Sequence, residues 1–181
     1  MTHAMSRANE ASGFTLIELL IVVAIIGTIA SLAAPGLLRA RMAAAESSAI
    51  GSLRTVSSAE STYSSSCGAN GYAQSLQDLA LPPSGSVAGF ISPDLAVNGI
   101  VKSGYELNVG PDASASTVIA ASRTCNGSSL DAVSSFFAEA HPTGLGVTGQ
   151  RSFAIDTRNT MYFMNPGVTI APGMAGASVL Q

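Results

Sequence analysis

A run of 25 mostly apolar residues, Phe14 to Leu38, constrains the fold of this 181-residue chain more than any other feature. Its only charged residue is Glu18, close to the start of the run. As an α-helix with a rise of 1.5 Å per residue, the run is about 37 Å long, and a bilayer core is roughly 30 Å thick. The run therefore predicts a membrane-spanning helix, preceded by a short polar leader and followed by a separate head.

A secretory signal peptide is the nearest alternative, because Ala30, Ala33 and Ala34 offer small residues for cleavage. The apolar part of a signal peptide has about 7–15 residues, so this run is longer than expected for one. A carboxylate at the entrance of that part is also unusual. These two observations favour a membrane helix.

Glu18 has two interpretations. The order Thr15-Leu16-Ile17-Glu18 fits a capping box, in which the threonine and the glutamate satisfy free N–H groups at a helix start. Alternatively, an ionisable group at the edge of a membrane segment is costly and usually has a partner. Cleavage after Gly13 would create such a partner, the amine of Phe14.

Residues 13–18, Gly-Phe-Thr-Leu-Ile-Glu, and the apolar helix behind them resemble the prepilin signature of type IV pilins and type II secretion pseudopilins. The resemblance implies that a membrane-embedded prepilin peptidase cuts between Gly13 and Phe14 and methylates the new amine of Phe14. It also implies that Glu18, the fifth mature residue, supports assembly by pairing with the N-terminal amine of a neighbouring subunit. The chain departs from the family at Ser12, where a lysine or arginine is usual.

Within the run, Gly27 and Pro35 stand where type IV pilins commonly have glycine and proline. Proline removes a backbone hydrogen bond, so we expect a kink or local melting near Pro35. The resemblance implies that this segment can unwind in a filament. Gly27, Ser31 and Ala34 also lie near one helix face, which either allows close helix packing or reflects ordinary use of small residues in membrane helices.

The composition argues against nucleic acid as a partner. Only 10% of residues are charged, the net charge is −3, and no basic cluster exists beyond Arg39 and Arg41. Hydrophobic residues make up 47% of the chain, and the head is rich in alanine, serine and glycine. A head of this kind has little need for charge if much of its surface faces copies of itself.

After Leu38 the pattern becomes amphipathic and predicts that one long helix continues to Ser65. The apolar stripe expected to pack on a sheet comprises Leu38, Met42, Ala45, Ala49, Leu53, Val56 and Tyr63. The charged residues Arg39, Arg41, Glu46 and Arg54 lie mostly off this stripe. Turn residues at 64–71 end the helix, and the segment to Gly99 reads as a loop with a short helix at 76–79.

Three or four strands are expected in the head. Alternation or apolar content predicts strands at 104–109, 135–140, 151–156 and 160–164, the last two joined by a short turn; 117–121 is either a short strand or loop. The predicted fold class is α+β, with the long helix packed on a small antiparallel sheet as in pilins. The glycine- and proline-containing tail, 166–181, is expected to be loosely held.

Two cysteines, Cys67 and Cys125, lie after the membrane run. If that side is extracytoplasmic, a disulfide between them is permitted, and two separate buried thiols are the alternative. No residues form an evident catalytic or metal-binding set: His141 has no cysteine or acidic cluster beside it in sequence, and Asp112, Asp131 and Asp156 are scattered. We therefore expect no enzymatic activity, metal or cofactor.

The sequence thus predicts five segments: a leader at 1–13, a transmembrane and polymerisation half-helix at 14–38, an amphipathic half-helix at 39–65, a head at 66–165 and a tail at 166–181. By the resemblance, the chain is a subunit of a type IV pilus-like filament, made as a precursor in the bacterial inner membrane. Its partners would be identical subunits, the prepilin peptidase, the inner-membrane assembly machinery and, before assembly, lipid. The alternatives are a pseudopilin of a type II secretion system, forming a periplasmic fibre, and a minor pilin acting in adhesion or DNA uptake.

Overall fold

The computed structural model describes residues 13–180, so all of the leader except Gly13, Ser12 included, lies outside the described residues. The chain divides into two units, Met1–Arg39 and Ala40–Gln181, and helix α1, Leu16–Ser66, belongs to both. The predicted helix, 14–65, agrees with α1 to within two residues. The expected melting near Pro35 is absent, because α1 is helical on both sides of this residue.

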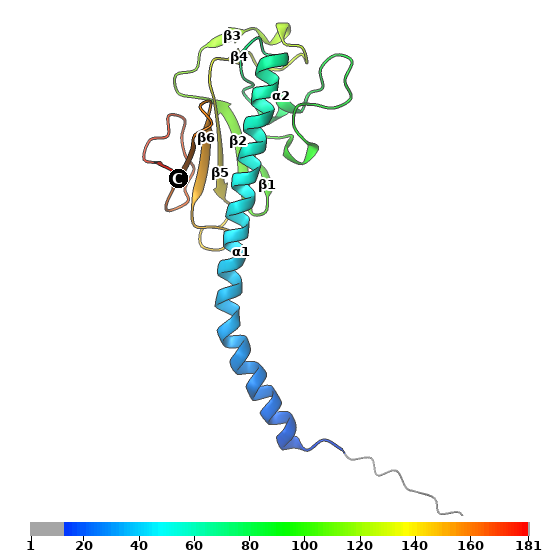
Figure 1. Cartoon of the computed structure of the whole chain (residues 1–181), viewed down its shortest axis with the longest axis vertical. Coiled ribbons are helices and arrows are strands. Elements are labelled where there is room, and N and C mark those ends of the chain that lie inside the picture. Colours follow the sequence, from blue (N-terminus) through cyan, green and yellow to red (C-terminus); the bar gives the residue numbers. More distant parts are fainter. Residues whose placement is uncertain (1–12, 181) are drawn as a thin grey trace, which may run out of the picture. The chain divides into compact units, whose positions relative to one another are not determined.

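A six-stranded antiparallel sheet forms the centre of the second unit, in the order β1-β2-β5-β6-β7-β8 (Figure 1). The strands are β1 (Ile100–Lys102), β2 (Tyr105–Pro111), β5 (Phe136–Pro142), β6 (Ser152–Asp156), β7 (Met161–Met164) and β8 (Ser178–Val179). A smaller sheet pairs β3 (Thr117–Ile119) with β4 (Ala132–Val133), which resolves the ambiguous segment in favour of a strand. The predicted hairpin is confirmed as β6–β7.

The core lies between one face of the large sheet and the part of α1 that belongs to the second unit. Alternate residues of β2, namely Tyr105, Leu107 and Val109, point into this core, as period-two alternation requires. From α1 the core contains Ala49, Leu53, Val56, Ala59 and Tyr63. The predicted stripe is therefore right from Ala45 onwards, whereas Leu38 is exposed and Met42 is only half-buried.

The other face of the sheet is partly covered by the C-terminal segment, so the expectation of a loosely held tail is wrong. Ile170 is buried against Phe137 and Ala154 in a second small cluster. Strand β8 pairs with β7, and the Leu180 N–H donates to the Met161 carbonyl at 2.8 Å. The buried side chain and the strand pairing hold this segment on the sheet.

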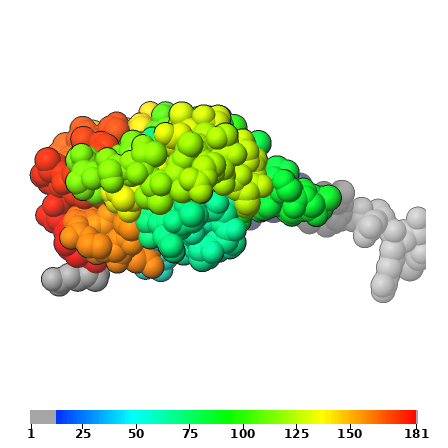
Figure 2. Space-filling model, turned by 90° about the horizontal axis from the view of Figure 1, so that it is seen from above, coloured from blue at the N-terminus to red at the C-terminus, as the bar shows by residue number. Residues whose placement is uncertain are grey.

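The connection from α1 to the sheet contains helix α2, Leu76–Ala80, close to its predicted position, and the 3₁₀ turn Pro93–Leu95. Ser75 caps α2 by accepting a hydrogen bond from the Asp78 N–H. The segment that follows α2 projects from the head, as the green atoms in Figure 2 show. Phe90 ties it back to α1 by packing edge-on against Tyr63, with ring centroids 5.4 Å apart. A second 3₁₀ turn, Ala121–Arg123, follows β3.

Candidate functional site

The start of α1 forms the capping box that the sequence predicts. Thr15 donates to a Glu18 carboxylate oxygen through its N–H at 2.9 Å and its hydroxyl at 2.7 Å, and the Glu18 N–H donates to the Thr15 hydroxyl oxygen at 3.2 Å. These three bonds satisfy orphan donors of the first turn. The carboxylate is therefore held against the backbone N–H and the side chain of Thr15.

The segment around this peptide bond is open to other molecules. Gly13, Phe14 and Thr15 are not helical, and Phe14 is 88% exposed. Among the described residues, no cation lies within 4 Å of the Glu18 carboxylate. The capping box involves only residues that follow the bond, so a cut between Gly13 and Phe14 would leave its hydrogen bonds in place.

The apolar half of α1 is uncovered by the rest of the described chain. Every residue from Gly13 to Arg41 is exposed, including Leu16, Ile21, Ile29 and Leu38. In length and composition this helix could cross a membrane. An apolar surface of this extent is unfavourable in water, at roughly 25 cal/mol for each Å² exposed. It requires a cover, either lipid or other protein.

Gly27 and Pro35 lie within this uncovered half of α1. A Cβ atom added to Gly27 would meet nothing within 4 Å, so no contact among the described residues requires a glycine there. Pro35 stands inside the helix, where it cannot donate to the Ser31 carbonyl. The hydroxyls of Thr28 and Ser31 donate at 2.8 Å to carbonyls three residues earlier, those of Ile25 and Thr28. The glycine and the proline both lower the stability of the helix, and no packing contact within the described chain requires either of them.

Cys67 and Cys125 form a disulfide bond. It joins the residue that follows α1 to the turn between the two strands of the small sheet. Cys67 is buried in the main core, and Cys125 is half-buried against it. The bond therefore fixes the distal end of α1 to the head.

Sequence reasoning missed two buried carboxyls near this end. Glu60 is fully buried; it accepts a hydrogen bond from the Ala73 N–H at 2.9 Å, and its other oxygen has no partner among the described residues. Burial raises the pKa of Glu60 well above its usual value, the Ala73 N–H opposes this, and nearby Asp78 adds to it. Asp78 accepts hydrogen bonds from the N–H and the hydroxyl of Ser129. The only signal in the sequence is the helical spacing of Glu60 from apolar residues: it follows Leu53 by seven residues and Val56 by four, and it precedes Tyr63 by three.

A polar cluster that contains Glu106, Asn108, Glu139 and His141 lies on the outer face of β2 and β5. Buried Glu139 contacts His141 at 3.1 Å, and its other oxygen accepts from the Asn108 amide at 2.8 Å. Glu106 lies 3.9 Å from the other ring nitrogen of His141. Burial raises the pKa of Glu139, although the contacts with Asn108 and His141 oppose the rise. These groups satisfy one another, which indicates a structural role.

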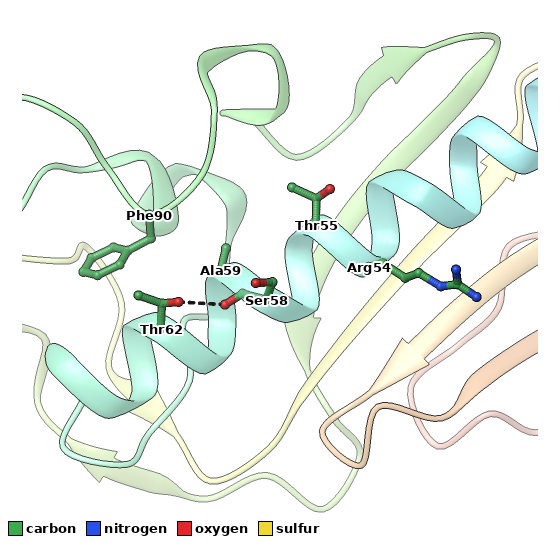
Figure 3. Close-up of a pocket in the computed structure, with 6 residues that line it drawn as sticks. All are labelled: Arg54, Thr55, Ser58, Ala59, Thr62 and Phe90. Carbon is green, nitrogen blue, oxygen red and sulfur yellow. Dashed lines mark hydrogen bonds between the residues drawn. The ribbon is translucent and has the colours of Figure 1, made fainter.

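A shallow pocket on the exposed face of α1 is lined by Arg54, Thr55, Ser58, Ala59 and Thr62, with Phe90 at its edge (Figure 3). Its two threonine hydroxyls already donate within α1, that of Thr55 to the Gly51 carbonyl and that of Thr62 to the Ser58 carbonyl. The Arg54 side chain extends away from the threonines in Figure 3. Over residues 13–180, no three His, Cys, Asp or Glu side chains are placed to share a metal ion.

The comparisons with known proteins give one match. Residues 9–34 match the family model of the prokaryotic N-terminal methylation motif, which covers the capping box, the exposed carboxylate and the first part of the apolar helix. No curated protein and no solved structure matches the chain. The motif is typical of structural, pilin-type proteins, and it implies processing by a prepilin peptidase and assembly into a pilus-type filament. Together with the long helix on an antiparallel sheet, it marks this chain with a type IV prepilin-like signature in an α+β, pilin-like architecture.

Proposed function

We propose that this protein is a structural subunit of a type IV pilus-like filament. The observation that carries the proposal is the uncovered apolar half of α1, with one exposed carboxylate at its start, on a head that has its own core. Before assembly the helix lies in the membrane. In the filament, apolar helices of other subunits replace lipid as its cover.

Cleavage between Gly13 and Phe14, followed by methylation of the Phe14 amine, is the first step of this mechanism. The mature N-terminus is then a positive charge beside the positive end of the α1 dipole. Glu18 of a neighbouring subunit pairs with this amine, and both charges are neutralised in an apolar surrounding. Because each subunit offers its amine to one neighbour and its carboxylate to another, the contact does not close and a filament grows.

Substitution of Glu18 separates this mechanism from simple helix capping. Glu18→Gln keeps a side-chain oxygen that can accept from the Thr15 N–H, so the capping box survives while the charge is lost. Glu18→Ala removes both. We expect both variants to insert into the membrane and neither to form filaments. Filaments from Glu18→Gln but not from Glu18→Ala would show that the cap matters and the charge does not.

Mass spectrometry of the mature N-terminus tests the processing step. We expect a peptide that begins with N-methylated Phe14. Ser12 stands where the related signatures have a basic residue, so Ser12→Lys is the informative companion variant, expected to be cut at least as completely. A mature chain that starts near Pro35 would contradict the proposal and indicate an ordinary signal peptide.

Gly27 and Pro35 are proposed as the flexible part of the filament, because each weakens α1 without serving a contact among the described residues. Pro35→Ala is expected to give filaments that extend less under load, measured by pulling single filaments. Proline inside a helix also favours an extensible surface pilus over a pseudopilin of a secretion system. Shear release of filaments that contain this protein distinguishes the two, since a pseudopilus remains in the periplasm.

A further inference from the structure

We propose that Met174 and Met164 form an oxidation-sensitive clasp that holds the C-terminal segment 171–177 on the outer face of the large sheet. Oxidation of the two thioethers to sulfoxides by a peroxide releases this segment. All residues involved belong to the second unit, and the clasp does not depend on whether the chain forms filaments.

The two methionines meet at the small cluster on the outer face. The buried residues of this cluster come from β5, β6 and the tail, and Met164, Met174 and Ala177 pack against them. Met164 also reaches the far part of the segment, because a Cβ atom added to Gly176 would lie 3.5 Å from the Met164 Cε atom. One methionine therefore contacts the cluster from within the segment, and the other contacts it from β7.

The backbone of Met174 shows that its side chain is needed at this position. Its φ is +57°, in the left-handed region, where a residue with a long side chain is rarely found. The other left-handed residues of the segment are Gly173 and Gly176, for which this conformation costs little. A residue stays in an unfavourable conformation only when its surroundings hold it there. For Met174 the contact with the cluster does so, and a glycine could not make it.

The remaining contacts of the segment are weak. The Gly173 N–H donates to the Asp112 carboxylate at 3.0 Å, in a hydrogen bond that is exposed to solvent. The N–H groups of Met174 and Ala177 donate to carbonyls of the segment itself, so they do not attach it to the sheet. A groove separates the start of the segment from β2 and β5, and its apolar lining comprises Val109, Pro111, Phe137, Ile170 and Pro172. Loss of the methionine contacts would therefore be enough to free the segment.

Oxidation of a thioether by a peroxide changes the chemistry of this contact. The sulfur attacks one peroxide oxygen and the O–O bond breaks. The products are a sulfoxide and water or, from an organic peroxide, an alcohol. The sulfoxide oxygen is a strong hydrogen-bond acceptor, and the side chains of Phe137, Ala154 and Ile170 offer it no donor. An oxidised Met174 therefore gains free energy by leaving the cluster for water, and its backbone strain is relieved as it leaves.

The clasp is accessible to a small oxidant. Met164 and Met174 are half-buried, whereas Met161 is only 8% exposed in the main core. Met42, half-buried on α1, offers a comparison away from the tail. The disulfide of the head is typical of oxidising compartments, where methionines meet peroxides.

The experiment uses the full chain in detergent, incubated with hydrogen peroxide. Mass spectrometry measures the sulfoxide at each methionine, and hydrogen exchange of residues 165–180 measures the opening of the tail. Exchange of β5 reports whether the head stays folded. The double variant Met164→Leu, Met174→Leu keeps apolar side chains without sulfur, and Met42→Leu is its matched control. Met174→Gln places a polar group in the cluster without any oxidant.

We expect peroxide to oxidise Met174 before Met161 and to raise exchange of residues 165–180 about tenfold, with β5 unchanged. The double leucine variant should show no such rise, and Met42→Leu should behave like the unmodified chain. Met174→Gln should exchange rapidly without peroxide.

Three results would overturn the clasp. One is unchanged exchange of residues 165–180 in chains whose Met174 is fully oxidised. Another is an equal rise in the double leucine variant, which would assign the opening to a different oxidation. The third is oxidation of Met161 ahead of Met174. None of these results bears on filament formation, so the proposed function would stand or fall separately.

Discussion

Arg151 and Glu46, 105 residues apart in sequence, form the contact that fixes the base of the head to α1. The guanidinium donates to one Glu46 oxygen from Nε at 3.0 Å and from a terminal nitrogen at 2.7 Å, and the backbone N–H groups of Arg151 and Gln150 donate to the other. The guanidinium also lies over the rings of Phe153 and Phe163, at 5.4 and 5.8 Å. A single carboxylate thus links the helix, the β5–β6 loop and the sheet.

Glu46→Gln is expected to lower the free energy of unfolding of the head by about 2 kcal/mol, because hydrogen bonds to a charged group are lost while the backbone donors keep an acceptor. Glu46→Ala should lower the free energy of unfolding further, since it leaves these backbone donors unpaired. Urea unfolding of the full chain in detergent, followed by tyrosine circular dichroism, measures both.

The matched control for this prediction is Arg158→Gln. Arg158 also pairs with a carboxylate, that of Asp156, at 2.6 Å, but its side chain is 75% exposed whereas that of Arg151 is 38% exposed. Exposed pairs contribute less than about 1 kcal/mol. If Glu46→Gln and Arg158→Gln lower the free energy of unfolding equally, the Glu46 contact contributes no more than an exposed ion pair, which contradicts the prediction.

Much of this fold follows from local pattern, and the rest depends on partners distant in sequence. Period-two alternation predicts β2, and apolar runs around a short turn predict the β6–β7 hairpin. Strands β1 and β8, only three and two residues long, carry too little pattern of their own and exist because a neighbouring strand pairs with them. The same holds for the tail, which is ordered by burial of Ile170 rather than by its composition.

The buried charged residues are the part of the polar sites that sequence predicts least well, because their partners lie far away in the chain. The helical pattern predicts Glu46 off the apolar stripe, yet Glu46 is buried, and the Arg151 guanidinium and two backbone N–H groups donate hydrogen bonds to it. Glu60 is buried although only the Ala73 N–H partners it. By contrast, the capping box of Thr15 and Glu18 was predictable, since both partners belong to one helical turn.

The pH dependence of head stability should be set in part by Glu60. The pKa of Glu60 is raised in the folded head, so the folded state holds this proton more tightly than the unfolded chain. The resulting stabilisation is complete below the unfolded pKa, about 4.3, and is lost as the pH rises through the folded pKa. The raised pKa of Glu139 acts in the same direction.

Glu60→Gln should therefore flatten the fall in melting temperature as the pH rises above about 4.3, because glutamine keeps an acceptor for the Ala73 N–H and has no proton to lose. Thermal unfolding of the full chain in detergent over a pH series measures this. Indistinguishable slopes for the variant and the unmodified chain would show that Glu60 does not titrate in this way.

The disulfide between Cys67 and Cys125 closes a loop of 58 residues. In the chain-entropy treatment, a loop of this length stabilises the folded state by about 4 kcal/mol. The double variant Cys67→Ser, Cys125→Ser is expected to lose most of this stabilisation, as measured by urea unfolding. Reduction of the disulfide in the unmodified chain should lower the free energy of unfolding by a similar amount. Mass spectrometry without reductant gives the direct check, and two free thiols in the purified protein would contradict the bond.

Gly149 is expected to be intolerant of any side chain. A Cβ atom there would overlap the hydroxyl of Tyr105, which is buried and donates to the Arg151 carbonyl at 2.8 Å. Gly149→Ala should cost roughly 1–3 kcal/mol of unfolding free energy, the usual cost of overpacking a core, and should disturb the loop that Arg151 and Glu46 hold. Gly110→Ala is the control, because a Cβ atom at Gly110 meets nothing within 4 Å. A loss at Gly110 as large as that at Gly149 would mean that the contact with Tyr105 does not determine the effect.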